Sequence, residues 1–149
     1  MKNIIIINGP NLNLLGRRET DIYGEQSFDE YFHALQNEHP DINLSYFQSN
    51  YEGAIIDRLH YVGFDHDGII LNAAGYTHTS IAIMDAIKAI STPVVEVHIS
   101  NIYEREEFRH FSYVELAAVH SIVGRGLKGY DEAILWLKDG NLSKATKEA

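Results

Sequence analysis

Four consecutive isoleucines at positions 4–7 limit the folds open to this chain more than any other feature. A strand with one face in water alternates apolar and polar residues, whereas a strand buried on both faces of a parallel sheet is apolar throughout. Similar runs recur near residues 69 and 94. The sequence therefore predicts a buried parallel sheet, with strands at 3–8, 42–48, 67–72, 93–98 and 120–124.

Helical patterns fill the intervals between these predicted strands. Ser27 and Glu30 form a capping box, which predicts that a helix starts there. Three further apolar stripes at helical spacing indicate helices around 55–62, 83–90 and 130–137. The alternation predicts a flavodoxin-like α/β fold, a doubly wound five-stranded parallel sheet with helices on both faces.

Length and composition narrow the class of protein. The 149 residues fit one catalytic α/β domain over 1–140, followed by a polar C-terminal tail at 141–149. A formal charge of −9 argues against a nucleic-acid surface, and the lack of cysteine excludes disulfides and thiolate metal sites. The apolar start is too short for a signal peptide or a membrane span. We therefore expect a cytoplasmic protein with no nucleic-acid or membrane partner.

The segment that follows the first predicted strand, 8–24, is too long for an ordinary strand-to-helix connection. Arg18 and Tyr23 lie near enough in the sequence to meet across a folded loop. Arg18, Arg105 and Arg109 all lie in or beside polar loops, and convergent arginines on an acidic protein indicate a site for a small anion. The alternative is a flexible surface loop with solvated charges.

Polar residues also follow the third and fourth predicted strands. Asn72 ends a buried strand, and Thr79 or Ser80 begins a helix whose free N–H groups favour an anion beside His78. Glu96 and His98 share one face of a strand where apolar residues are the norm. Because a carboxylate orients an imidazole and raises its basicity, His98 is a candidate acid or base. The alternative is a buried structural histidine with a carboxylate partner.

Cofactor sites are weaker interpretations. His78, Glu96 and His98 are metal-ligand types, but they form no tight ligand motif. Residues 124–129 match G-x-G-x-x-G, yet no further strand with an acidic residue follows, so a tight turn is the better interpretation.

Two other functions are alternatives. A domain that binds FMN or another phosphate ligand would share the fold, but this function would not explain why Tyr23, Arg18, Glu96 and His98 occur together. A phosphoacceptor domain requires an acidic cluster after the first strand, where 8–11 supply none. We expect no cofactor and no metal.

Four segments together resemble the type II 3-dehydroquinate dehydratases. They are NGPNLNLLGRRE-x-x-IYG at 8–24, THTS at 77–80, VEVHISN at 95–101 and REEFRHFS at 105–112. The resemblance runs from the first strand to the last helix, and several ordered motifs make it more specific than any single pattern. It implies trans-elimination of water from 3-dehydroquinate, through an enolate, to give 3-dehydroshikimate in the shikimate route to aromatic amino acids.

The same resemblance implies residue roles. Tyr23 is the implied base, Arg18 keeps Tyr23 ionised, Asn11 helps to stabilise the enolate through a bound water, and His98 protonates the departing hydroxyl. The implied substrate-binding residues are Asn72, His78, Asp85, Ile99, Ser100 and Arg109, and the implied supporting residues are Glu96 and Arg105. Asp85 would come from a neighbouring subunit, because the family packs as trimers assembled into homododecamers.

Two positions depart from the family pattern. Thr20 stands where proline is usual, and Phe111 stands where histidine is frequent. Neither is one of the implied catalytic groups, so these departures bear on how the 8–24 loop moves rather than on the reaction.

Overall fold

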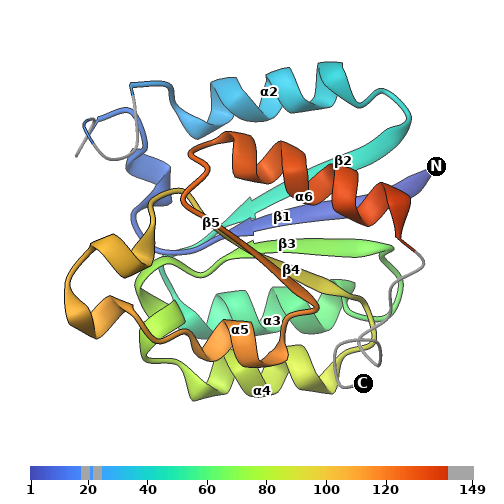
Figure 1. Ribbon diagram of the computed structural model, residues 1–149. Coiled ribbons are helices and arrows are strands. Elements are labelled where there is room, and N and C mark those ends of the chain that lie inside the picture. The colour runs from blue at the N-terminus through green and yellow to red at the C-terminus, as the bar shows by residue number, and fades with distance from the viewer. Residues whose placement is uncertain (18–20, 22–24, 141–149) are drawn as a thin grey trace.

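A computed structural model describes residues 1–17, 21 and 25–140 (Figure 1). Its five strands are all parallel and lie in the order β2-β1-β3-β4-β5, which confirms the predicted flavodoxin-like fold. The strands are β1 (Lys2–Asn8), β2 (Ile42–Gln48), β3 (Gly68–Asn72), β4 (Val94–His98) and β5 (His120–Val123). The helices are α2 (Phe28–Glu38), α3 (Glu52–Val62), α4 (Ile81–Ala89), α5 (Tyr113–Ala117) and α6 (Lys128–Asp139).

The isoleucine run of β1 explains the three layers. Ile4 and Ile6 pack into the core beneath α2 and α6, whereas Ile5 and Ile7 pack into the core against α3 and α4. Figure 1 shows α2 and α6 on one side of the sheet and α3, α4 and α5 on the other. Each buried isoleucine contributes about 1.5–3 kcal/mol through loss of apolar surface from water. This inner strand is therefore apolar on both faces, because its side chains pack into two cores.

Serine caps define where several helices begin. The Ser27 hydroxyl accepts the backbone N–H of Glu30 at 3.2 Å, as the capping box predicts. The Ser80 hydroxyl accepts the N–H of Ile83 at 2.9 Å, so Ser80 rather than Thr79 caps α4. These caps fix the start of α2 and the start of α4.

The segment between β4 and β5 was not predicted in detail. It contains two 3-10 turns, η3 (Ile102–Glu104) and η4 (Glu107–Arg109), followed by the short α5. Elements of three to five residues are too short to show helical periodicity, so the sequence pattern does not reveal them. The predicted tail at 141–149 lies outside the described residues.

The G-x-G-x-x-G segment forms the turn between β5 and α6. Gly124 and Gly126 have φ angles of 76° and 61°, which L side chains rarely adopt. A Cβ at Gly129 would lie 3.2 Å from Val97, so this end of α6 packs closely on the sheet.

Among the described residues, no helix combines the length and the apolar character needed to span a membrane.

Candidate active site

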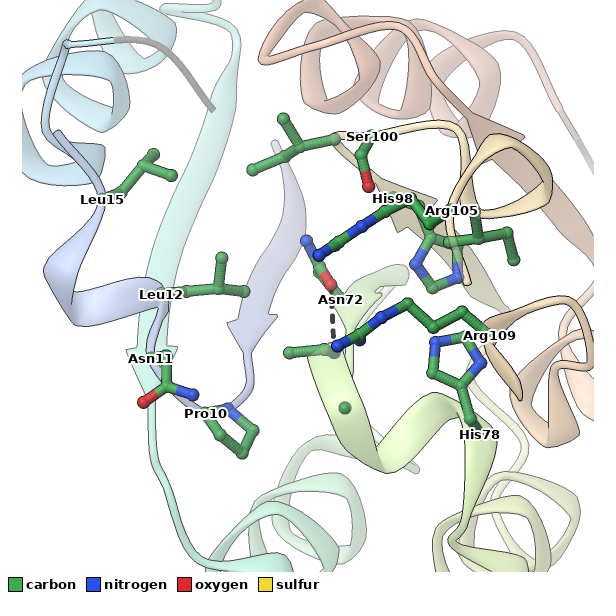
Figure 2. A pocket seen from close by; sticks show the side chains of 14 residues that line it. Pro10, Asn11, Leu12, Leu15, Asn72, His78, His98, Ser100, Arg105 and Arg109 are labelled. Atoms are coloured by element: carbon green, nitrogen blue, oxygen red, sulfur yellow. Dashed lines mark hydrogen bonds between the residues drawn. The ribbon is translucent and has the colours of Figure 1, made fainter. Parts of the chain in front are cut away.

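A cavity of about 160 Å³ opens where β1, β3 and β4 end. The carboxyl ends of parallel strands are where ligands bind in doubly wound sheets. Four lining residues come from 10–15, three more from 72–75, and the rest from 78 and 98–109 (Figure 2). Its walls are Pro10, Asn11, Leu12, Leu15, Asn72, Ala74, Gly75, His78, His98, Ile99, Ser100, Ile102, Arg105 and Arg109.

The loops after β1 and β3 touch beneath this cavity. The Gly9 N–H donates to the Asn72 carbonyl at 2.7 Å. A Cβ at Gly9 would lie 2.5 Å from the Ala73 carbonyl oxygen, closer than side chains approach backbone. Glycine at this position therefore allows the two loops to approach closely, and the approach places Asn11 and Asn72 in one cavity.

Backbone strain is concentrated at the cavity. Asn11 and Ala74 have φ angles of 70° and 53°, and both line it. For a residue with a Cβ this conformation costs about 1–2 kcal/mol. Two asparagine side chains offset that cost by accepting hydrogen bonds. The Asn11 N–H donates to Asn50 Oδ1 at 3.0 Å, and the Ala74 N–H donates to Asn72 Oδ1 at 3.1 Å. Strain held in place by its surroundings is typical of functional sites.

The cavity wall is cationic. Arg105 and Arg109 supply its positive charge, His78 and His98 lie beside them, and the described lining residues include no carboxylate. Glu106, which is half exposed, contacts Arg109 Nε at 3.0 Å and Arg105 Nε at 3.7 Å. A planar guanidinium bound through Nε still presents its terminal N–H groups to an anion. The wall therefore suits a small anionic ligand.

His78 lies beside His98, with ring centroids 6.3 Å apart. Burial lowers the pKa of His78, and the neighbouring His98 and Arg109 act in the same direction. The ring donates Nδ1–H to the Phe111 carbonyl at 2.8 Å. A neutral His78 in this tautomer presents Nε2 as an acceptor for a ligand hydroxyl.

Glu96 and His98 form a buried pair at the end of β4. His98 Nε2 lies 2.7 Å from Glu96 Oε2, and the two side chains are 5% and 1% exposed. Glu96 also accepts hydroxyl hydrogens from Ser112 at 2.5 Å and from Ser121 at 2.7 Å. Because Nε2–H is donated to Glu96, Nδ1 is the His98 nitrogen that can exchange a proton with a ligand.

Three donors keep the Glu96 carboxylate ionised in this setting. Burial alone would raise its pKa, but the bonds from His98, Ser112 and Ser121 outweigh burial, and the pKa lies below its usual value. The carboxylate therefore stays charged and holds the imidazole of His98 in one orientation.

The lowered pKa of Glu96 makes stability depend on pH in a defined window. The stabilisation that ionised Glu96 contributes to the folded state is fully present above pH 4.5, the ordinary pKa of a glutamate. It is lost as the pH falls through the lower pKa that Glu96 has in the folded state. We expect Glu96→Gln to reduce the free energy of unfolding at pH 7 and to flatten its decline below pH 4.5, as measured by urea titration at several pH values. Glu107→Gln, at an exposed carboxyl group, is the control. A decline as steep as that of the unmodified protein would contradict the assignment.

A second group of ligand-type residues lies away from the cavity. Among the described residues, Glu38, His39 and Asp131 place one ligand atom each within 4.8 Å of one another. His39 Nε2 is bonded to Asp131 at 2.6 Å, and the Lys138 ammonium lies 2.9 Å from His39 Nδ1. A positive charge at that distance repels a cation, so we interpret the group as a link between α2 and α6.

The structure brings most of the described candidate residues together and leaves Asp85 apart from them. Asp85 is exposed on α4 and is not among the cavity residues, and Arg18 and Tyr23 lie outside the described residues. Glu96 supports the cavity from behind His98. Those that line the cavity are Asn11, Asn72, His78, His98, Ile99, Ser100, Arg105 and Arg109.

Sequence reasoning missed the groups that hold these residues in place. Ser121 is the register partner of Glu96 on β5, and Ser112 caps α5 while it donates to the same carboxylate. The role of Ser121 follows only from the register in which β5 pairs with β4. The local sequence does not predict the register between two parallel strands that a long connection separates. The apolar wall formed by Leu12, Leu15 and Ile102 was also missed, because isolated leucines and isoleucines carry no functional signal.

The family model, the related sequences and the solved structures that the chain resembles all belong to one enzyme family. The family model described as dehydroquinase class II matches residues 2–138. A 3-dehydroquinate dehydratase of Caldicellulosiruptor saccharolyticus is 51% identical over 142 residues, which cover 93% of this chain and 98% of that protein. The 3-dehydroquinate dehydratase 1 of Agrobacterium fabrum is 52% identical with the same coverage. The crystal structure of a type II dehydroquinase from Butyrivibrio crossotus superposes with a TM-score of 0.84 at 47% identity, covering 92% of this chain and 97% of that chain.

Proposed function

The chain belongs to the class II dehydroquinase family, and we propose that the cavity at the ends of β1, β3 and β4 is where it dehydrates 3-dehydroquinate. As a member of that family, the protein is a hydro-lyase that forms 3-dehydroshikimate in the shikimate pathway. The observation that carries the placement is the buried Glu96–His98 pair, which opens onto a wall with two arginines and, among the described lining residues, no carboxylate. We place the reaction in the cytoplasm.

The elimination requires a base, an acid and stabilisation of an enolate. Removal of a proton beside the ketone places negative charge on the ketone oxygen, and loss of the β-hydroxyl then requires a proton from the other side. We assign proton removal to Tyr23, with Arg18 keeping it ionised. Asn11 stabilises the enolate through a bound water, and His98 protonates the departing hydroxyl through Nδ1.

The remaining cavity residues bind the substrate. Arg109 offers its terminal guanidinium N–H groups to the carboxylate, with Arg105 beside it in support. His78 and Asn72 bind hydroxyl groups, and the backbone of Ile99 and Ser100 completes the contact. These assignments are supported by the shared cavity and by the charge of its wall. No step in this scheme needs a cofactor or a metal ion.

A direct assay tests the function. Dialysed, chelator-treated protein mixed with 3-dehydroquinate should produce the absorbance of a conjugated enone, and heat-inactivated protein should not. A protein that gives no enone signal, or that carries a flavin absorbance band and needs it for turnover, would contradict the proposal. Loss of activity on chelation, restored by a divalent ion, would contradict the cofactor-free reaction.

Asp85 supports a proposal about assembly. It is exposed on α4 and lies outside the cavity of its own chain. We propose that it completes the site of a neighbouring subunit in a homododecamer built as a tetramer of trimers. Sedimentation should then show a species far larger than the 16.9 kDa chain.

Mixing variants tests whether Asp85 acts across a subunit boundary. Asp85→Ala and His98→Ala subunits should each be nearly inactive alone. Coexpressed, they should regain activity, because about a quarter of randomly assembled sites then pair an intact His98 with a neighbour's intact Asp85. A mixture no more active than its components, or a fully active monomer, would contradict the proposal.

A further inference from the structure

Tyr130 of α6 joins the ends of two strands beneath the cavity. Asn8 ends β1, Asn72 ends β3, and the two are register partners. The Tyr130 hydroxyl donates to Asn8 Oδ1 at 2.8 Å and accepts from Asn72 Nδ2 at 2.9 Å. Tyr130 and Asn8 are 0% exposed and Asn72 is 4% exposed. A residue with no part in the proposed chemistry thus contacts a cavity residue through buried polar atoms.

The direction of each bond in this chain follows from one fixed donor. The Ala74 backbone N–H can only donate, so the Asn72 atom that it contacts at 3.1 Å is the oxygen. The Asn72 nitrogen therefore faces Tyr130. Because the phenol carries one hydrogen, that hydrogen points to Asn8. Reversing the Asn72 amide would place two donors against each other at Ala74, so its orientation is locked.

The hydroxyl itself is held firmly. The Tyr130 ring packs edge-on against the Phe28 ring, with centroids 4.9 Å apart, and makes a tilted contact with the Tyr31 ring at 6.4 Å. Burial raises the pKa of Tyr130 far above its ordinary value, so the phenol remains a donor at all working pH values. Side chains in so dense a core do not change rotamer freely. The hydroxyl is therefore a rigid reference point for Asn72.

We propose that Tyr130 is a positioning residue for substrate binding. Its hydroxyl fixes the amide of Asn72, so that the second amide hydrogen of Asn72 and the backbone turn at Ala74 face the substrate in one defined orientation. The proposal rests on the assignment of Asn72 as a substrate-binding residue. An amide nitrogen has two hydrogens, so Asn72 can hold Tyr130 with one and offer the other to a ligand. Without the hydroxyl, only the Ala74 N–H still holds the Asn72 amide, and the amide plane can tilt at the cavity wall.

Kinetics of Tyr130→Phe separate this role from a purely structural one. Loss of positioning should raise KM for 3-dehydroquinate about tenfold and change kcat little, because a binding contact is lost rather than a proton-transfer group. A purely structural role lowers the melting temperature and the active fraction, which reduces apparent kcat and leaves KM unchanged. Assays run well below the melting temperature, with folding checked by circular dichroism.

Tyr46→Phe is the matched control. Its ring stacks on the same Phe28 at 4.7 Å, and its hydroxyl lies 3.5 Å from Asn8 Nδ2 without contact to Asn72. The same loss of a hydroxyl in the same core should leave KM within twofold of the unmodified enzyme.

A double-variant cycle with Asn72→Ala shows whether Tyr130 acts through Asn72. The variant carrying both changes should have the KM of Asn72→Ala alone, whereas independent effects would multiply. If Tyr130→Phe does not fold, Asn8→Ala replaces it, since loss of the acceptor frees the hydroxyl and should raise KM several-fold. Unchanged KM in the folded variant, or multiplied effects, would overturn the proposal while the enzyme still turns over its substrate. An unmodified protein without turnover would instead contradict the proposed function.

Discussion

His98→Gln should lower kcat by about 10²–10⁴-fold, the range that a positioned general acid contributes. The reason lies in the geometry of the pair. Glu96 holds Nε2 at 2.7 Å, which aims the other ring nitrogen at the cavity. Glutamine keeps a donor for Glu96, so the buried carboxylate does not lose its partner, but it has no proton to give near neutral pH. Steady-state rates of enone formation measure the loss.

The control is His33→Ala, at an exposed position on α2, which should leave kcat unchanged. Unfolding in urea should show that His98→Gln is folded, so that a low rate cannot come from loss of structure. A folded His98→Gln variant with a rate within tenfold of the unmodified enzyme would refute the role of His98 as the acid.

Tyr23→Phe should abolish proton removal while the substrate still binds. A free tyrosine has a pKa of about 10 and is almost wholly protonated at neutral pH. An arginine about 4 Å away, at an effective dielectric near 20, offers roughly 4 kcal/mol, or about three pKa units. Desolvation opposes part of this gain. If Arg18 lies beside Tyr23 as proposed, the pair would bring the phenol near the working pH, which a tyrosine alone would not reach.

Two measurements test this pair. Exchange of the substrate's α-proton with deuterated solvent should stop in Tyr23→Phe, with binding retained in a titration, whereas Tyr61→Phe at an exposed site should exchange normally. Arg18→Ala should cut turnover and shift the rise of activity with pH toward higher pH, since a phenol without its cation ionises later. Near-normal turnover in Tyr23→Phe, or an unchanged pH profile in Arg18→Ala, would show that another group is the base.

Local patterns predict the parts of this molecule that depend on local sequence. The isoleucine run predicts a strand buried on both faces, and Ser27 with Glu30 predicts the start of α2. The sequence also predicts that the polar residues at the ends of the strands lie at one edge of the sheet, because the carboxyl ends of parallel strands meet there. The flavodoxin-like sheet follows from these patterns and is confirmed by the strand order.

The supporting contacts depend on tertiary structure and could not be predicted. Tyr130 belongs to an apolar stripe of α6, and nothing in that stripe shows that its hydroxyl reaches Asn8, 122 positions earlier. Ser121 looks like any strand serine until β5 pairs with β4. A sequence names the groups that do chemistry more readily than the groups that orient them, because orientation is set by residues far apart in the chain.

The placement of α6 has a consequence for synthesis on the ribosome. Ile4 and Ile6 are made long before Ile134 and Leu137, which belong to the same core. Until α6 emerges, the nascent chain carries an uncovered apolar sheet face, a surface prone to aggregation and to capture by chaperones. Asn8 likewise receives the Tyr130 hydroxyl only then. Synthesis from the N-terminus therefore leaves closure of this core to α6, and chains stalled before residue 130 should be clients of the quality-control machinery.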